Sequence, residues 1–398
     1  MVDFWYNEFV SSVLLTGYLL ILTVSWGLMI LGVHSWGKKW MVNPPERIPE
    51  KGELLSICIP ARNEERNIGD CVRAALQSTW PNFEVVVVND RSSDATAEKA
   101  LEAAAGDSRL RIVSGEEPAL GWAGKPWTCA RAAKEAKGNW LLFVDADVRL
   151  HRDAGAVAVL LAKERALDLL SFFGQWTMLS FWERALIPAV GWFIRGSVNF
   201  DDVNHQAKAE AFANGQFILM RRSCYFEMEG HASVRDQVLE DVRLAQAVKR
   251  AGYRAELRPA PWSFSVRLYS SLGEIINGYT KNLYEGMNRN FLVGVAAVSF
   301  ILFGSIFPFV GCIGGVLSLL GGWTLLSPLM VFWFFLVCFL QILFRYNIER
   351  FDGHSGWYSL THPIANLLLV VILIRSTFGV RVQWKGRSFV DGKAEKKS

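Results

Sequence analysis

The segment NWLLFVDADVRL, residues 139–150, joins an apolar run to two aspartates. The uninterrupted apolar residues 140–144 predict a strand that is buried on both faces. Asp145 and Asp147 follow directly, and two like charges so close together repel each other and are costly to desolvate. We therefore expect a cation to lie between them. The alternative is that the pair caps a following helix, where aspartate is common.

Other acidic residues stand at the ends of strand-like or helix-like segments. Asp90 follows four consecutive valines, and its alternative interpretation is a turn-forming residue in NDRSSD. Asp94, in the same stretch, is better explained as the cap of the next helix. Glu240 and Asp241 open a helical pattern, where acids are also favoured by the helix dipole. A carboxylate at such a place can alternatively serve as a general base.

The elements that must position these residues alternate along the chain from residue 54 to about residue 267. Short apolar runs alternate with amphipathic stretches, such as 67–77 and 94–105, which predicts a mostly parallel α/β sheet with helices on both faces. The predicted strands are 54–60, 83–89, 110–114, 140–146, 167–173 and 215–220. Ligands of such sheets bind beyond the carboxyl ends of the strands. We therefore expect residues 60–64, 89–94 and 145–147 around one crevice.

An N-terminal segment, residues 9–33, contains no charged residue and is long enough to cross a bilayer. Acidic residues precede it and the basic stretch HSWGKKW follows it, so the positive-inside rule predicts an outer N-terminus and a cytoplasmic chain from residue 34 onward. A cleaved signal peptide is the alternative. The absence of a basic leading region and the length of the apolar run argue against it.

The C-terminal part contains further membrane candidates. Residues 291–344 carry no charge and are long enough for two spans that break near residues 321–323, and residues 364–374, extendable to 380, form a shorter third segment. Three spans would place the tail outside, whereas its basic sequence argues for the inside. Either the last segment does not cross fully or the tail departs from the charge rule.

Two other apolar segments interrupt the α/β pattern. Residues 180–198 are apolar around most of a helix but too short in their uncharged part to span, so we favour a helix lying on the membrane over a buried core helix. Residues 271–290 look like an amphipathic connector. The predicted organisation is therefore an anchor (1–36), a linker (37–52), an α/β domain (53–270), the connector, membrane segments (291–380) and a basic tail (381–398).

Composition limits the class of protein. A hydrophobic fraction of 51% suggests a soluble domain with a few membrane segments, and a net charge of +4 without a basic block argues against nucleic acid as a partner. Six cysteines occur without a CxxC pair. We expect reduced, mostly buried thiols rather than disulfides or a zinc site.

Four motifs in order give a resemblance to the family 2 glycosyltransferases of GT-A fold, over roughly residues 52 to 290. They are SICIPARNEERNI, VVVNDRSSDAT, VDADV and HASVRDQVLEDVRLAQAVKRAGYR. Together they are far more specific than any one of them. The membrane segments and the phrases GWAGKPW, DLLSFF, NGQF, VLEDVRLA and GYTKN resemble the branch that glycosylates apolar lipids: chlorobactene-type carotenoid glucosyltransferases, with hopanoid-associated and ceramide glucosyltransferases as relatives.

The resemblance implies a role for each acidic residue. Asp147 would be a metal ligand, and Asp145 would contact the nucleotide ribose or the metal through water. Asp90 would accept a hydrogen bond from the uracil N–H, and Asp241, supported by Glu240, would be the general base. The remaining predicted donor contacts are Pro60, Arg62, Glu64, Lys125, Asn214, Gly215, Gln216 and Arg267. A solvated surface position is the alternative for Lys125.

A divalent metal agrees with these side chains. The diphosphate of a nucleotide sugar leaves only if its charge is neutralised, and a metal held by carboxylate oxygens can supply that charge. Oxygen ligands favour Mg²⁺ or Mn²⁺.

One departure from the family limits the product. Processive members carry a Gln-x-x-Arg-Trp signature after the base, where this chain reads FSVRLYSS, with Phe264 and Leu268 in the places of Gln and Trp. Arg267 alone is kept, which disfavours polysaccharide synthesis.

The sequence therefore predicts an inverting, metal-dependent enzyme of the cell membrane. It would move one hexose, with UDP-glucose the favoured donor, to a hydroxyl of an apolar lipid such as a carotenoid or hopanoid, with its catalytic domain in the cytoplasm. The alternatives are a polyprenyl-phosphate sugar synthase, a processive polysaccharide synthase and a membrane protein that binds nucleotide sugars without catalysis.

Overall fold

A computed structural model describes the chain in two compact units. The α/β unit comprises Gly37–Met178, Gly196–Leu268 and Gln383–Ser398, and the helical unit comprises Met1–Trp36, Leu179–Arg195 and Tyr269–Val382. The described residues are 2–35, 37–44, 47–196, 198–237, 239–287, 289–322, 326–379, 382–384, 387–390 and 393–394. Trp323, at the predicted break, and half of the basic tail 381–398 lie outside them.

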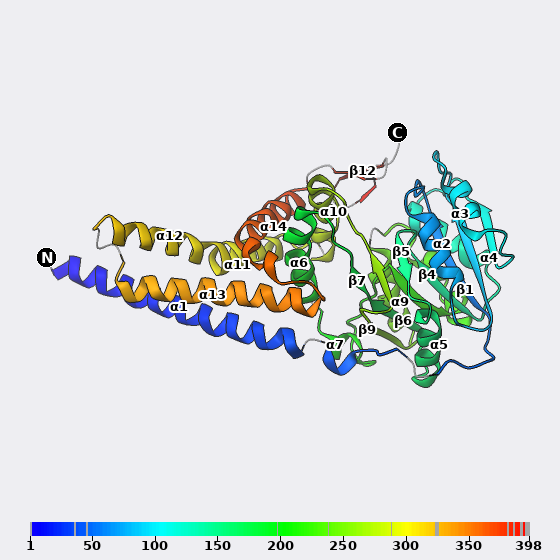
Figure 1. The fold of residues 1–398 in the computed structure, drawn as a ribbon, viewed down its shortest axis with the longest axis horizontal. Coiled ribbons are helices and arrows are strands. Elements are labelled where there is room, and N and C mark those ends of the chain that lie inside the picture. Colours follow the sequence, from blue (N-terminus) through cyan, green and yellow to red (C-terminus); the bar gives the residue numbers. More distant parts are fainter. Residues whose placement is uncertain are drawn as a thin grey trace. The chain divides into compact units, whose positions relative to one another are not determined.

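A seven-stranded sheet forms the centre of the α/β unit (Figure 1). Its strands are β1 (Leu55–Ala61), β2 (Phe83–Asn89), β3 (Leu110–Ser114), β4 (Trp140–Val144), β6 (Leu169–Phe173), β8 (Phe217–Arg221) and β9 (Ala255–Pro259). Their order is β3-β2-β1-β4-β8-β6-β9. Only β8 runs antiparallel to its neighbours β4 and β6. The predicted α/β fold with a mostly parallel sheet is confirmed.

The chain turns at the two aspartates after β4. The Val148 N–H donates to the Asp145 carbonyl over 3.1 Å, and the short strand β5 (Val148–Leu150) follows. β5 pairs with β10 (Phe264–Val266), which also pairs with β7 (Gln175–Trp176). The helix-cap alternative for the aspartates is therefore wrong, because a strand and not a helix comes next.

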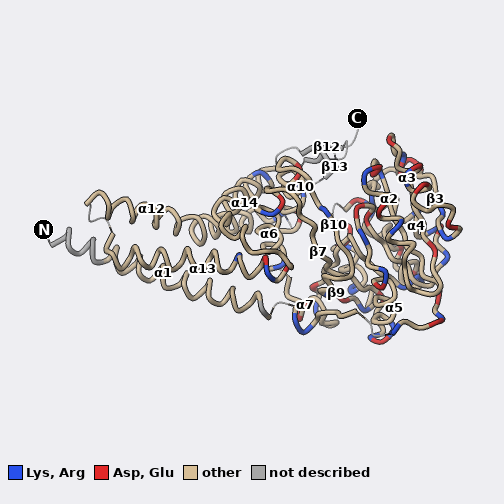
Figure 2. The backbone as a smooth tube through the Cα atoms, viewed as in Figure 1, with Lys and Arg blue, Asp and Glu red and all other residues tan. Residues whose placement is uncertain are grey.

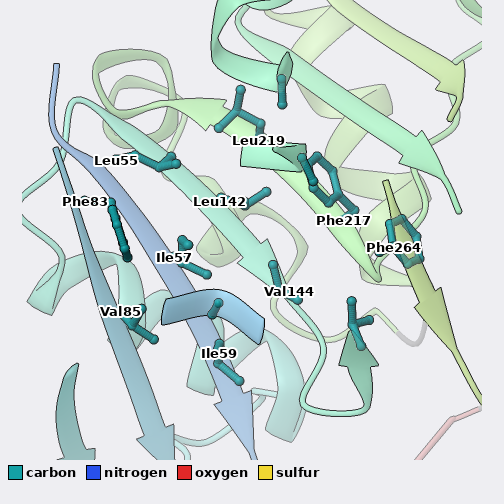
Figure 3. Packing of buried hydrophobic residues seen from close by; sticks show 14 of the residues in the cluster. Leu55, Ile57, Ile59, Phe83, Val85, Leu142, Val144, Phe217, Leu219 and Phe264 are labelled. Atoms are coloured by element: carbon teal, nitrogen blue, oxygen red, sulfur yellow. The ribbon is translucent and has the colours of Figure 1, made fainter. Parts of the chain in front are cut away.

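The sheet is buried on both faces, as the apolar runs predict. On one face the side chains of Leu55, Ile57, Leu142 and Leu219 pack together (Figure 3). Cys58, which points to the opposite face of β1, belongs to a second buried cluster. The helices that contribute to these clusters are α2 (Ile68–Leu76), α3 (Thr96–Ala104) and α5 (Ala154–Glu164) on the first face, and α4 (Gly124–Glu135), α8 (Arg222–Glu227) and α9 (Glu240–Arg250) on the second.

Smaller elements complete this unit. They are η1 (Lys38–Trp40), α7 (Phe200–Val203), η2 (Gly230–Val234), and the strands β11 (Val382–Trp384), β12 (Arg387–Val390) and β13 (Lys393–Ala394). In the whole chain the six cysteines are free, and all but the half-buried Cys312 are buried. The expectation that these thiols are mostly buried is confirmed.

The helical unit consists of long apolar helices and shorter packed ones. Its helices are α1 (Val2–Ser35), α6 (Phe181–Gly196), α10 (Leu272–Gly286), α11 (Phe291–Ile301), the π-turn η3 (Leu302–Ile306), α12 (Phe307–Leu320), α13 (Pro328–Phe351), η4 (Trp357–Thr361) and α14 (His362–Thr377). Among the described residues, four helices are long and apolar enough to cross a membrane: Val10–Trp40, Phe291–Leu320, Pro328–Phe351 and Trp357–Thr377. Figure 2 shows α1, α12 and α13 almost free of charged residues. One N-terminal and three C-terminal apolar helices agree with membrane anchoring.

Helix α6, the predicted interfacial helix, packs one face inside this unit. Pro188 lies within the helix and has no N–H for the Arg184 carbonyl. The buried Arg345 of α13 supplies the missing donor, because its Nη2 donates to the Arg184 carbonyl over 2.8 Å and to the Ala185 carbonyl over 2.9 Å. Arg345 also pairs with Glu349 over 3.1 Å. That the other face of α6 lies on the membrane stays a prediction.

Candidate active site

Lys125 connects the two acidic pairs that the sequence singles out. It lies in the first turn of α4, and its Nζ is 2.8 Å from Asp145 Oδ1 and 2.9 Å from Glu240 Oε1. Although desolvation lowers the pKa of Lys125, the carboxylates of Asp145 and Glu240 raise it more, so the net pKa lies well above the usual value. The alternative of a solvated surface lysine is therefore wrong. Lys125 thus provides one cation next to Asp145, whereas the cation expected between Asp145 and Asp147 stays a prediction.

Glu240 and Asp241 occupy the first turn of α9, with the Glu240 side chain buried. Asp241 Oδ2 accepts the N–H of Gly215 and Oδ1 accepts the N–H of Val242, each over 2.8 Å. Burial raises the pKa of Asp241 to about 6; the charge of Glu240 adds to this rise, and Lys125 and the two N–H groups oppose it. Asp241 is therefore a carboxylate that is mostly ionised at pH 7 and can accept a proton from a bound group.

Gly215 leaves the space in which Asp241 and Lys125 approach each other. A Cβ at this position would lie 2.9 Å from Asp241 Oδ2 and 3.1 Å from Lys125 Nζ. The neighbouring Asn214 is fixed to β6, because its N–H donates to Ser171 Oγ over 2.8 Å and its Nδ2 to the Phe172 carbonyl over 3.1 Å. Gln216 Oε1 accepts from Asn214 Nδ2 over 3.3 Å.

A second polar group lies where β1 and β2 end. Asp90, which is 3% exposed, accepts from Arg91 Nε over 3.0 Å and lies 3.5 Å from Arg62 Nη1. The Asp90 N–H donates to the Ala61 carbonyl over 2.8 Å, which ties the two strand ends together. Arg91 was not among the predicted residues, although its place directly after Asp90 was a signal for it.

Glu64 and Asp94 order the loops next to Asp90. Glu64 is buried, and its Oε2 accepts from Asn67 Nδ2 over 3.0 Å. Its N–H donates to Thr96 Oγ1 over 2.8 Å. Asp94 Oδ1 accepts the N–H of Thr96, the first residue of α3, over 3.1 Å, but the N-cap residue is Ala95, so Asp94 lies one residue before the capping position that we predicted for it.

The sheet explains which predicted residues come together. β4, β1 and β2 are parallel neighbours, so the segments after Val144, Ala61 and Asn89 leave the same edge of the sheet. Direct contacts join Lys125 to Asp145 and Glu240, and Asp241 to Gly215. Pro60 lies in the last part of β1, and Arg267 follows β10. Their roles, like those of the other site residues, stay predictions.

The donor set fits a divalent cation that a substrate helps to hold. The described residues contain no group of three or more His, Cys, Asp and Glu side chains placed to bind a metal. Mg²⁺ is usually bound by one or two carboxylates together with substrate phosphates and water, and not by a complete protein cage. Asp145 and Asp147, at one turn, provide those two carboxylates.

Comparison with protein families defines the class. Residues 56–225 match the model of glycosyl transferase family 2, and residues 200–395 match that of glycosyl transferase family 21. The fold and the matched segments define a glycosyltransferase, and residues 56–225 are the part that resembles family 2.

Named relatives are similar over most of the chain. A 4,4'-diaponeurosporenoate glycosyltransferase of Staphylococcus aureus (strain MRSA252) is 27% identical over 85% of this chain and 88% of its own. The same-named protein of Staphylococcus haemolyticus is 26% identical over 67% of this chain and 71% of its own.

Solved structures show weaker likeness. A mannosyltransferase from Pyrobaculum calidifontis, in complex with GDP-Man and Mn²⁺, is 17% identical over 92% of this chain and 98% of its own, with a TM-score of 0.49. Glucosyl-3-phosphoglycerate synthase of Mycobacterium tuberculosis, with Mn²⁺, UDP-glucose and phosphoglyceric acid, is 16% identical over 59% and 81%, with a TM-score of 0.40.

Proposed function

We propose that this glycosyltransferase transfers a single hexose, with inversion, from a nucleotide diphosphate sugar to an apolar lipid at the membrane. UDP-glucose is the favoured donor, and a carotenoid-type molecule is the favoured acceptor. The observation that carries the proposal is the contact of Lys125 with both Asp145 and Glu240, beside Asp241. This contact joins the predicted diphosphate side of the site to the predicted base.

On the donor side, Asp145 and Asp147 are the residues that would hold Mg²⁺ or Mn²⁺. When bound, the metal would neutralise charge on the leaving diphosphate. Lys125 is within reach of the same place, so we propose that it exchanges its contact with Asp145 for a diphosphate oxygen when the donor binds. Asp90 and Glu64, both buried, would bind the base and the ribose.

On the acceptor side, Asp241 would take the proton of a hydroxyl as that oxygen attacks the anomeric carbon. Inversion needs one base on the face opposite the leaving group. A pKa of about 6 suits that role, because the carboxylate is ionised at pH 7 and still accepts a proton readily. The N–H groups of Gly215 and Val242 would hold its two oxygens in place.

The names of the staphylococcal relatives favour a second acceptor chemistry. The ending of diaponeurosporenoate denotes a carboxylate, which has no proton to lose at neutral pH. If this chain also acts on a carboxylate, Asp241 would orient the acceptor or the sugar and not act as a base. With a polyprenyl phosphate as acceptor, Asp241 would likewise not act as a base. Identification of the product distinguishes a carboxylate acceptor from a phosphate acceptor.

The apolar helices support placement in the cell membrane. We propose that α1 crosses outward to inward, that Phe291–Leu320 and Pro328–Phe351 form a hairpin through the membrane, and that the α/β unit is cytoplasmic. A membrane-dissolved acceptor is then available to the enzyme without passing through water. The departures at Phe264 and Leu268 from the processive signature favour one sugar per acceptor.

The test uses membranes that contain the full chain, labelled UDP-glucose and Mn²⁺ or Mg²⁺, followed by extraction into organic solvent. We expect label in a lipid, lost with EDTA and in Asp147→Ala, and kept in Asp107→Ala, whose carboxylate pairs only with nearby Arg109 among the contacts described. Label in an insoluble polymer would instead indicate a processive synthase. Nucleotide-sugar binding without any labelled product, across a panel of donors and apolar acceptors, would overturn the proposal in favour of a non-catalytic protein.

A further inference from the structure

Four buried polar side chains meet inside the helical unit, where η3, α13 and α14 come together. Ser305, Gln341, His362 and Asn366 are each at most 7% exposed. Ser305 Oγ donates to Gln341 Oε1 over 2.7 Å, and Asn366 Nδ2 donates to Ser305 Oγ over 2.6 Å. Trp26 covers this polar cluster with its ring 5.8 Å from that of His362. Polar groups inside a membrane protein are costly and are commonly functional.

The hydrogen bonds determine which groups of the polar cluster remain unused. Asn366 Nδ2 lies 2.9 Å from His362 Nε2, and since the amide donates, Nε2 accepts. The neutral imidazole then carries its proton on Nδ1. The single hydroxyl proton of Ser305 is already given to Gln341. Two buried atoms of this cluster have no hydrogen-bond partner among the described residues, His362 Nδ1 and Gln341 Nε2, and both are donors.

Helix α14 begins beside the middle of a membrane helix and ends beside its start. At its C-terminal end the ring of Phe378 lies 5.8 Å from that of Phe291, the first residue of α11. At its N-terminal end His362 contacts Ser305, near the middle of Phe291–Leu320. With a rise of about 1.5 Å per residue, Ser305 lies only about 21 Å along a helix that is about 45 Å long.

The chain returns along α13 before α14 begins. After α13 ends at Phe351, the His354 N–H donates to the Glu349 carbonyl over 2.7 Å, and η4 packs against α13. His362 then reaches the level of Gln341, ten residues before the end of α13, through the shared contact with Ser305. The end of α13 and the end of α14 therefore lie toward the same end of this helical bundle.

We propose that α14 enters the membrane part-way and leaves it on the side where α13 ends. Its N-terminal end then forms a site for an oxygen atom of a membrane-dissolved apolar molecule. Two unpaired donors, Gln341 Nε2 and His362 Nδ1, require an acceptor such as a carboxylate, carbonyl or hydroxyl oxygen. The positive end of the α14 dipole favours the same chemistry. The π-turn η3 at Ser305 agrees, since π-turns often mark functional sites.

This inference rests on the proposed function for its ligand, a lipid that carries such an oxygen. The part-way entry of α14 also explains why the tail is basic, because a helix that does not cross leaves the following chain on the cytoplasmic side. A cation is excluded as the ligand of these two atoms, because both are hydrogen-bond donors.

The side of the membrane on which α14 ends is tested with single cysteines at exposed positions of the helical unit. Leu292, Leu320 and Phe378 are 75%, 80% and 68% exposed, and a Cys312→Ala background removes the one thiol that is not buried. An impermeant maleimide should label Leu292→Cys and Phe378→Cys from one side and Leu320→Cys from the other. Labelling of Phe378→Cys from the side of Leu320→Cys would show that α14 crosses.

The site is tested by photolabelling the full chain in phosphatidylcholine nanodiscs without nucleotide sugar. The probe is palmitate with a diazirine beside its carboxylate, and its matched control is a diazirine alkane of equal length. We expect the palmitate to label peptides containing Ser305, Gln341 or His362. Labelling should fall at least tenfold in Gln341→Leu and in His362→Phe, and should persist in Cys338→Ala, one turn from Gln341 on α13.

Each outcome of the photolabelling either supports or overturns the proposed site. Equal labelling by the alkane, or equal labelling of the wild type and both variants, would overturn the site and leave water as the partner of the two donors. Monodisperse elution and a thermal unfolding transition close to that of the wild type identify variants that are folded, and either single variant alone is sufficient. Because no donor is present, failure of lipid glycosylation with intact labelling would contradict the proposed function and not this site.

Discussion

The two units of the protein each contain a buried polar cluster, and the clusters differ in charge. In the α/β unit, Lys125 stands among the carboxylates of Asp145, Glu240 and Asp241 and remains partly exposed. In the helical unit, Gln341 and His362 belong to an uncharged network that is closed to solvent. The first cluster has an excess of negative charge and the second an excess of donors. The proposed ligands match this difference, a metal cation with a diphosphate for the first cluster and an oxygen acceptor for the second.

The largest expected effect lies in the charged cluster. Asp241→Asn keeps the shape of the side chain but removes the base, so transfer to a hydroxyl acceptor should fall by about 10²- to 10⁴-fold. The measurement is initial rate of lipid labelling at saturating donor. Asp236→Asn, an exposed position hydrogen-bonded to Gln237, is the matched control. Nearly full activity of Asp241→Asn would instead identify a carboxylate or phosphate acceptor.

Lys125→Met should have the next largest effect, because it leaves Asp145 and Glu240 without their shared cation. A hydrogen bond to a charged group contributes roughly 1.5–3 kcal/mol, so we expect a loss of roughly 10- to 100-fold in kcat/KM. Lys125 also lowers the pKa of Asp241, so the acid limb of the pH–rate profile should move to higher pH. Lys125→Arg keeps the charge and should restore that limb. An unchanged pH–rate profile in Lys125→Met would show that Lys125 does not influence the pKa of the base.

Gly215→Ala tests the close approach within the same cluster. The added methyl would lie 2.9 Å from Asp241 Oδ2 and must displace it, so transfer should fall roughly tenfold, with a loss of about 1–2 kcal/mol in the free energy of unfolding. Gly69→Ala on α2, where the nearest atom would be 3.6 Å away, is the control. A rate equal to that of the wild type would show that Asp241 does not need its present position.

Glu240→Gln should change the pH dependence more than the maximal rate. The wild-type rate should fall as the pH drops through about 6, because protonated Asp241 cannot accept a proton. Glu240 raises the pKa of Asp241, so its neutralisation should move this acid limb to lower pH. Rates measured from pH 5 to pH 9 at saturating donor show in which direction the acid limb moves. A shift to higher pH would mean that the loss of the Lys125 contact dominates.

The α/β unit could be predicted well because its strands are set by local apolar runs. β2 and β3 begin and end at the predicted residues. β4 ends at Val144, two residues early, since the chain turns at Asp145 to form β5. The antiparallel direction of β8 and the partners of Lys125 depend on contacts between distant segments, which no local pattern contains. For the same reason hydropathy alone left open whether α14 crosses the membrane.

The smallest effect is expected in the uncharged cluster. Gln341→Leu removes an unpaired donor together with the acceptor of the Ser305 hydroxyl. Losing one neutral hydrogen bond while relieving one buried unpaired group should change stability by no more than about 1 kcal/mol. Thermal unfolding in detergent, compared with Cys338→Ala, measures this change. A much larger loss would mean that the cluster holds the helices together, whereas near-neutrality combined with lost photolabelling would mean that it is kept for a ligand.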